Sequence, residues 1–256
     1  MTCRWCYGQL TKPILSFKNF PMYPSSVKKG ELQDNSNNYY VYDFEIVICK
    51  SCNLIQQLNN PNFEILYSFS RNEGIGLKWK NHYHEFAKFI DNFKMEGSYL
   101  EIGGGNLLLA NNLLNSGIKD ISIVEFDQTY KDKNFKFYNN KFEKINFEEK
   151  FNVIYSSHVF EHIEDFQKHL DQILLILEEN GLLFISLPDF EKWISKFYLN
   201  SFVQDHLVYP TKNIIIEYLS KYFQLISYRS FEDHSMFLCF KKKSKLGNTN
   251  FSFNKS

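Results

Sequence analysis

The feature of the chain that most constrains its fold is a regular alternation of apolar segments from residue 98 to residue 243. Short runs rich in β-favouring residues alternate there with stretches of helical periodicity. The predicted strands cover residues 98–103, 120–126, 135–138, 153–157, 182–187, 224–229 and 236–242, and the predicted helices cover 107–115, 166–178 and 213–222. The last two strands read as a terminal hairpin. This alternation predicts a doubly wound, Rossmann-like α/β sheet of seven strands.

The first 66 residues have a different character and predict a small β module. Turn-forming residues gather between Pro21 and Asn38, and two short β-favouring runs follow at 39–42 and 44–48. So short a segment has too small a core to hold itself without a disulfide or a metal. Beyond it, we expect a helical connector over 67–95, the α/β core over 96–243 and a flexible polar tail over 244–256.

Four of the five cysteines form two pairs of equal internal spacing, Cys3-x-x-Cys6 and Cys49-x-x-Cys52. Zn²⁺ in structural sites prefers a tetrahedron of four thiolate or imidazole ligands, and two such turns supply it. A redox-active pair is the weaker alternative, because neither pair lies in a βαβ context. The pattern therefore predicts a closed, structural zinc site. Cys239, on a predicted strand, is expected to be a core residue.

Charge and hydropathy bound the partners and the compartment. The 29 Lys and Arg residues balance the 29 Asp and Glu residues, whereas proteins that bind duplex nucleic acid usually carry a basic excess. We expect no nucleic-acid partner and no membrane partner, since no apolar run reaches the ~18 residues of a membrane span. The chain shows no basic and apolar leader at its start. A cytoplasmic location with reduced cysteines is expected.

A glycine-rich turn follows the first predicted strand of the core. Glu101 precedes Gly103 and Gly105, and glycines allow a cofactor close to the backbone. The nicotinamide fingerprint would need a third glycine where Leu108 stands. A carboxylate two residues before Gly-x-Gly suits S-adenosylmethionine (SAM) better, although a plain strand–turn–helix remains the alternative. Glu125, about 20 residues on, is the preferred acid for the ribose hydroxyls.

The second acid in that segment, Asp127, is the weaker candidate for the ribose. Further along, a polar cluster follows the predicted strand at 153–157 and begins with Ser157 and His158. It continues through Glu161 and His162. The carboxyl edge of an open α/β sheet is where ligands bind, so this cluster is expected at the site.

Together these segments resemble the class I SAM-dependent methyltransferases. The stretch from Glu101 to Gly105 is similar to their first cofactor motif, Glu125 to their ribose-binding acid, and residues 157–163 to the signature after their fourth strand. The turn at 179–181 is similar to the one before their fifth strand. The resemblance implies SAM as cofactor. It also implies that the cofactor-binding residues are Glu101, Gly103, Gly105, Glu125, Ser157 and His158.

A narrower resemblance includes the cysteine pairs and residues 53–56 and 67–70. These stretches are similar to zinc-bearing methyltransferases that act on nucleotide-linked deoxysugars. That family has a catalytic Glu-His pair, and Asp205-His206 stands at the matching place; its neighbouring tyrosine falls at Val203. The resemblance implies His206, Asp205 and His162 as catalytic residues. Tyr67 and Tyr209 are the implied substrate contacts.

The methyl acceptor stays open. The family's long C-terminal domain has no counterpart in this sequence, so oxygen methylation of a capsule or surface-glycan precursor, including a phosphoramidate-type acceptor, is as consistent as carbon methylation of a sugar. A hydroxyl acceptor benefits from a general base, for which His206 is the first candidate. An RNA methyltransferase that reads RNA with its zinc module, and a non-catalytic SAM-binding module, are the alternatives from other classes.

Overall fold

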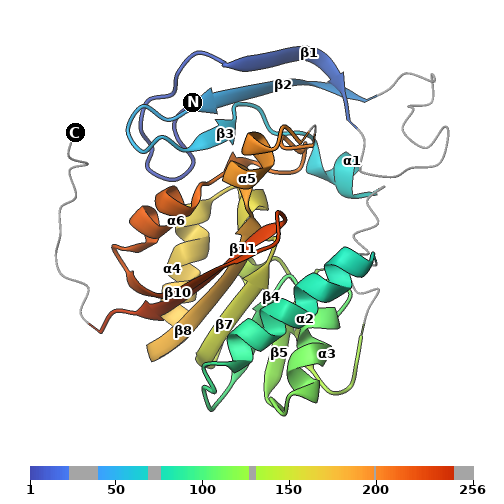
Figure 1. Ribbon diagram of the computed structural model, residues 1–256, viewed down its shortest axis with the longest axis vertical. Coiled ribbons are helices and arrows are strands. Elements are labelled where there is room, and N and C mark those ends of the chain that lie inside the picture. Colours follow the sequence, from blue (N-terminus) through green and yellow to red (C-terminus); the bar gives the residue numbers. More distant parts are fainter. Residues whose placement is uncertain (23–39, 69–75, 127–130, 199, 245–256) are drawn as a thin grey trace.

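The computed structural model of the chain describes residues 1–22, 40–68, 76–126, 131–198 and 200–244, without the side chains of residues 67 and 68. Two sheets make up the fold (Figure 1). The larger has seven strands in the order β10-β11-β8-β7-β4-β5-β6. Its strands are β4 (Tyr99–Ile102), β5 (Ile121–Val124), β6 (Lys136–Tyr138), β7 (Phe151–Ser157), β8 (Leu177–Pro188), β10 (Phe223–Phe231) and β11 (Ser235–Lys242).

The seven-stranded sheet is mostly parallel. Strands β6, β5, β4, β7 and β8 run parallel to their neighbours, and β11 pairs antiparallel with both β8 and β10. The predicted sheet and its terminal hairpin are therefore confirmed. The carboxyl ends of β4, β5, β7 and β8 lie at one edge of the sheet. Strand β4 marks the topological switch point, because β5 and β6 lie on one side of it and β7 and β8 on the other.

Helices cover both faces of this sheet. On one face, α4 (Phe166–Ile176) and α6 (Lys212–Leu219) bury residues such as Leu170, Ile173 and Ile215 against Leu100 and Ile154. The opposite face carries α2 (Leu77–Asp91) and α3 (Leu108–Asn115). Alternate residues of β4 contact opposite faces, since Leu100 belongs to the first core and Tyr99 to the second.

Several predicted boundaries differ from the structure. The helix predicted over 166–178 ends at Ile176, because Leu177 already begins β8. The helical connector contains two helices, α1 (Phe63–Ser68) and α2, instead of one continuous helix. The predicted tail at 244–256 lies outside the described residues except for its first. In the described part of the chain no helix is long and apolar enough to cross a membrane.

The smaller sheet lies over one end of the larger one (Figure 1). Its order is β1-β2-β3-β9, with β1 (Leu15–Pro21), β2 (Val41–Ile48) and β3 (Ile55–Gln57) all antiparallel to their neighbours. The two short strands predicted at 39–42 and 44–48 are one strand, because β2 runs unbroken from Val41. Strand β9 (Val208–Tyr209) comes from beyond residue 200 and pairs with β3. The predicted domain boundaries at residues 66 and 95 thus stay predictions. The pairing of β3 with β9 joins the predicted N-terminal module to the predicted core.

Candidate active site

The four paired cysteines gather at one point in the N-terminal region. Their sulfur atoms all lie within 4.8 Å of one another. Cys3 Sγ is 3.7 Å from Cys52 Sγ, and Cys6 Sγ is 3.4 Å from Cys49 Sγ. A Zn²⁺ bound at ~2.3 Å by four thiolates spaces the sulfurs about 3.8 Å apart. The sulfur positions therefore fit a tetrahedral cation.

The two cysteine turns have the same backbone design. In the first, Tyr7 N donates to Cys3 O and Cys3 N donates to Gly8 O; in the second, Asn53 N donates to Cys49 O and Cys49 N to the carbonyl of residue 54. Tyr7 and Asn53 both have left-handed φ values, 59° and 60°. The repeated turn directs both sulfurs of each pair to the same side. It explains why the equal Cys-x-x-Cys spacing places four sulfurs together.

The thiols of this cluster do not titrate independently. The hydrogen bond from Cys52 lowers the pKa of Cys3 to about 5, while burial raises the pKa of Cys6 to about 12 and contact with Cys3 raises that of Cys52. One thiolate is thus favoured at the expense of its neighbours. A bound divalent cation would allow all four cysteines to be deprotonated together, because it favours the thiolate form of every ligand.

Trp5 joins the cysteine turns to the larger sheet's helices. Its side chain is 1% exposed and stacks on Phe166 of α4 with ring centroids 4.4 Å apart. Tyr218 of α6 donates a hydrogen bond of 2.7 Å to the Trp5 carbonyl. The cysteine turns are therefore packed directly against α4 and α6.

The glycine-rich turn connects β4 to α3 at the carboxyl edge of the larger sheet. Gly103 has φ of 77°, and a Cβ there would lie 2.6 Å from Val159 Cγ2. Gly105 has φ of 47° and faces open space. Its amide donates a 2.9 Å hydrogen bond to Glu125 Oε2, which lies just past β5. The turn is held open beside an acidic acceptor, as a bound nucleoside requires.

Two further polar groups bear on the fit of SAM to this turn. The Nδ2 of Asn106 is buried and finds no hydrogen-bond acceptor among the described residues. The Glu101 carboxyl is 2% exposed and accepts a 3.3 Å hydrogen bond from Tyr155, and burial raises its pKa well above the usual range. The open turn, Glu125 and the unpartnered Nδ2 of Asn106 fit SAM. Glu101 supports the end of β4, and its contact with the cofactor stays a prediction. Asp127 lies outside the described residues.

Ser157 ends β7, and His158 follows it; two further histidines, His82 and His234, lie beside them. Ser157 Oγ lies 2.9 Å from Nε2 of His82, a fully buried residue of α2. His158 has a left-handed φ of 55°, and its Nε2 lies 2.8 Å from Ser235 Oγ. His234 Nδ1 lies 2.6 Å from the same hydroxyl. Burial, assisted by neighbouring imidazoles, lowers the pKa of His82 strongly and that of His234 to about 3. These two rings are neutral near pH 7.

A buried carboxylate and two imidazoles meet where the loop after β7 contacts the segment before β9. His206 Nε2 lies 3.9 Å from Glu161 Oε1, and the His162 ring is 4.9 Å from the His206 ring at 81°. His162 Nδ1 is 2.8 Å from the carbonyl oxygen of Asp205. Because a carbonyl only accepts, Nδ1 carries a proton and Nε2 of a neutral His162 holds the free lone pair. The predicted residues His206, Asp205 and His162 thus lie together around Glu161.

The charges of this cluster are unequal. Burial raises the pKa of Glu161, but His158, His162 and His206 outweigh it and lower the pKa to about 2. Burial lowers the pKa of His206 to about 4. Burial also opposes protonation of His162, but Asp205 and Glu161 outweigh it and raise the pKa. Near neutral pH, Glu161 is an anion, His206 is neutral, and His162 is the more basic imidazole.

A small, shallow cleft opens on this cluster, with about 210 Å³ of non-atom space that includes open solvent. Glu161 and His206 line one side; the apolar wall includes Phe190, Trp193, Val208 and Tyr209. The hydroxyl of Tyr209 donates a 2.8 Å hydrogen bond to the Val203 carbonyl, so this side chain reaches the cleft with its ring. Tyr67, the other predicted substrate contact, lies in α1 with its side chain outside the described part.

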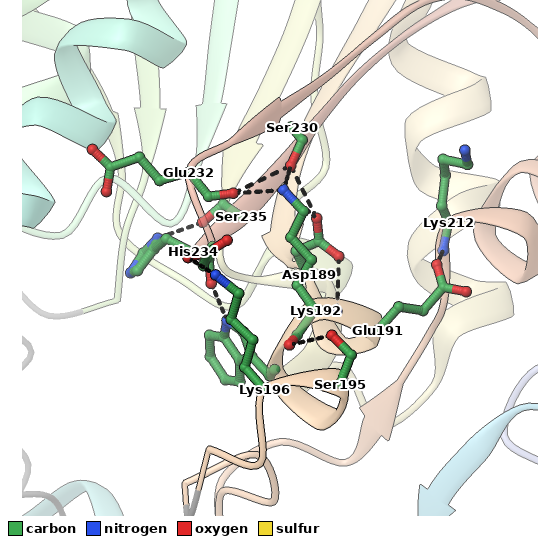
Figure 2. Close-up of polar contacts among 12 residues, drawn as sticks. Asp189, Glu191, Lys192, Ser195, Lys196, Lys212, Ser230, Glu232, His234 and Ser235 are labelled. Carbon is green, nitrogen blue, oxygen red and sulfur yellow. Dashed lines mark hydrogen bonds and ion pairs between the residues drawn. The ribbon is translucent and has the colours of Figure 1, made fainter.

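Helix α5 (Phe190–Ser195) supplies the aromatic wall and is clamped by polar contacts (Figure 2). Asp189 accepts from the Lys192 amide at its start. The Lys192 Nζ donates to Ser230 Oγ at 2.6 Å and to the Glu232 carbonyl at 2.7 Å. These contacts join α5 to the turn between β10 and β11. The cleft therefore has a fixed wall.

Residue-by-residue reading of the sequence missed three groups in this region. His82 stands on a helix 75 positions before its partner Ser157, so no local pattern joins them. Gln57 is fully buried and donates to carbonyls of the 203–206 segment. Glu161 was part of the signature at 157–163 and was assigned no role. A carboxylate between two histidines, in the polar cluster after the predicted strand at 153–157, was the available signal.

Comparison with known proteins agrees with this geometry. A family model described as a methyltransferase domain matches residues 77–241. No curated protein matches the chain. The chain is similar in fold to the N-methyltransferase NodS from Bradyrhizobium japonicum WM9 in complex with S-adenosyl-L-homocysteine (SAH), with TM-score 0.52, 11% identity, and 66% of this chain and 89% of that chain covered.

Two further solved structures share the fold at low identity. One is the 1,6-didemethyltoxoflavin-N1-methyltransferase of Burkholderia thailandensis, with TM-score 0.53, 11% identity, and coverage of 64% of this chain and 80% of that chain. The other is the magnesium protoporphyrin IX methyltransferase ChlM of Synechocystis PCC 6803 with bound SAH, with TM-score 0.52, 11% identity, and coverage of 72% and 90%. The family match spans more than half of the sequence, and the sheet order and glycine turn agree with it, so this chain belongs to the methyltransferase-domain family and is a class I SAM-dependent methyltransferase.

Proposed function

We propose that this enzyme methylates an oxygen atom of a small cytoplasmic metabolite, a nucleotide-linked sugar or a precursor of a capsule or surface glycan. A phosphoramidate-type acceptor is included. The observation that carries the proposal is the cluster of His162, Asp205 and His206 at the same edge of the sheet as the glycine turn, of which His206 lines a small cleft. The toxoflavin and protoporphyrin enzymes support a small acceptor, because their names give small-molecule acceptors.

The residues of the glycine turn would hold the cofactor. Glu125 accepts the ribose hydroxyls, Gly103 and Gly105 allow close approach, and Ser157 and His158 border the pocket. When bound, SAM supplies a methyl carbon on a sulfonium and leaves as SAH with the bonding electron pair. The chain's own contribution is to align the acceptor and exclude water.

The cluster would manage the acceptor proton. A hydroxyl acceptor loses its proton to Nε2 of His162, whose opposite nitrogen is fixed by the Asp205 carbonyl. As the proton leaves, the acceptor oxygen forms its bond to the methyl carbon. His206 has a lowered pKa and stays neutral, so it positions the acceptor in preference to taking the proton. An anionic phosphoryl oxygen would need no base.

We assign the cysteine cluster to a structural zinc ion. Four sulfur ligands close the coordination shell, so the site stabilises the fold and takes no part in methyl transfer. Its role would be to hold the β1–β3 region in place against α4 and α6.

The test combines SAM titration with an acceptor screen. Isothermal titration should give one SAM per chain, and incubation with nucleotide-linked sugars and glycan precursors should give a mass gain of one methyl. His162→Asn should lower kcat with that acceptor by about 100-fold or more, whereas His84→Asn, an exposed histidine of α2, serves as the matched control. Absence of SAM binding, or methylation of RNA in place of every small acceptor, would refute the proposal.

A further inference from the structure

The carboxylate of Glu161 is buried without a hydrogen bond of full geometry in the described part of the chain, although three histidines stand near it. It is 1% exposed, and neither of its oxygens accepts a hydrogen bond from a described residue. Its ion-pair neighbour His158 lies 3.1 Å away without hydrogen-bond geometry. Burying an unsatisfied carboxylate costs several kcal/mol. A bound partner that contacts the Glu161 carboxylate would offset this cost.

We infer that Glu161, His162 and His206 form a second metal site, separate from the cysteine cluster, for a divalent first-row cation. One ligand atom from each of the three residues lies within 4.8 Å of the others. Two imidazoles and one carboxylate are a common ligand set for such cations, and they leave coordination positions open. Ligands on adjacent positions of a cation at ~2.1 Å stand about 3 Å apart. Small rotations of these side chains therefore close the site.

The surroundings of His162 fix which of its two ring nitrogens is free to bind a cation. The Asp205 carbonyl accepts from Nδ1 of His162, which leaves Nε2 as the metal-binding nitrogen. A metal-bound histidine typically donates its other N–H to a carbonyl or carboxylate in this way. The cysteine site has sulfur ligands and a closed shell, so the two sites differ in the cations they favour. Four thiolates suit Zn²⁺, whereas two imidazoles and one carboxylate also accept other divalent first-row cations, of which Mn²⁺ serves here as the spectroscopic probe.

The position of the site gives the class of ligand. Glu161 and His206 line the cleft that we assign to the methyl acceptor. One carboxylate and one divalent cation leave a net charge of plus one, which favours an anionic or chelating oxygen such as a vicinal diol or a phosphoryl group. A cation lowers the pKa of a bound hydroxyl. With the cation bound, His162 and His206 are ligands and His162 is no longer the base, so the proton leaves to solvent while the oxygen forms the bond to the methyl carbon. This consequence rests on the proposed function; the binding of the cation does not.

The experiment titrates Mn²⁺ into the zinc-loaded enzyme and follows free Mn²⁺ by electron paramagnetic resonance. The wild type should bind one Mn²⁺ per chain, and Glu161→Gln and His206→Asn should each weaken binding by about tenfold or more. Glu148→Gln, an exposed carboxylate before β7, should bind as the wild type does. Circular dichroism and SAM titration verify that each variant is folded.

The outcomes separate the two proposals. If the wild type binds no Mn²⁺, or if both variants bind it as tightly as the wild type, the metal site is refuted while SAM binding and methyl transfer can stand. If Mn²⁺ binds but no small acceptor is methylated, the metal site stands and the proposed function falls. Should Glu161→Gln fail to fold, the wild-type stoichiometry and His206→Asn still decide.

Discussion

Replacing Gln57 by Leu should loosen the segment that carries His206. Gln57 Nε2 lies 2.6 Å from the His206 carbonyl, 2.8 Å from that of Gln204 and 3.2 Å from that of Val203. A side-chain amide has two hydrogens, so these three contacts amount to two full hydrogen bonds. Leucine keeps roughly the volume of the side chain, removes both bonds and also removes the acceptor of the Tyr42 hydroxyl, which lies 3.4 Å from Gln57 Oε1.

The three carbonyls do not lose equally. Val203 keeps the hydrogen bond from the Tyr209 hydroxyl, and the half-buried Gln204 can reach water. The His206 carbonyl is left buried without a partner, which costs about 1–3 kcal/mol. A central loss of about 2 kcal/mol lowers the melting temperature of a chain of this size by roughly 4–8 °C. Opening of the 203–207 segment should become roughly 30-fold more frequent.

Urea unfolding measures the global loss, and amide hydrogen exchange measures the local one. The control is Gln56→Leu on the same strand, which removes a hydrogen bond from the Arg4 amide and touches no carbonyl of that segment. Both variants should be less stable, but only Gln57→Leu should speed exchange at residues 203–207. Equal exchange in the two variants, or unchanged stability of Gln57→Leu, would refute the argument.

Three further outcomes are expected. Cys49→Ser should abolish zinc binding in elemental analysis, whereas Cys239→Ser, in the core of β11, should retain one zinc per chain. Glu125→Gln should weaken SAM binding in calorimetry by roughly tenfold or more, because a charged hydrogen bond is worth about 1.5–3 kcal/mol, and Asp120→Asn at the other end of β5 should not. His82 is neutral in the folded protein, whereas in the unfolded chain it takes up a proton below about pH 6.5. The free energy of unfolding should therefore decrease as the pH is lowered below that value. In urea, His82→Gln should show a shallower fall between about pH 8 and pH 5; an identical slope contradicts the assignment.

Sequence patterns predicted the features that depend only on residues close together in the chain, namely the strands, the glycine turn and the cysteine turns. The alternation of strands and helices correctly predicted the seven-stranded sheet, because each buried strand is itself an apolar segment that can be recognised without its partners. The glycine turn and Glu125 were recognisable for the same reason, and the structure joins Gly105 to Glu125 by a hydrogen bond. The matched cysteine spacing predicted that Cys3, Cys6 and the second pair would meet, since both turns fold alike.

Contacts between distant segments were beyond such patterns. Strand β9 has only two residues, and nothing in Val208–Tyr209 states that its partner is β3. The loop at 157–163 was expected at the sheet edge, but its pairing with His82 and with the 203–206 segment depends on packing across the molecule. The unsatisfied state of Glu161 likewise follows from what surrounds it and not from its neighbours in the chain.

The pairing of β3 with β9 also bears on how the chain is synthesised. Gln57, the last residue of β3, leaves the ribosome 151 residues before Val208, the first residue of β9. At 5–20 residues per second, the edge of β3 waits roughly 8–30 s for that partner. An open strand edge is a template for pairing with other chains. The nascent N-terminal region would thus pass through an interval of exposure to aggregation, which ends only when β9 has been made.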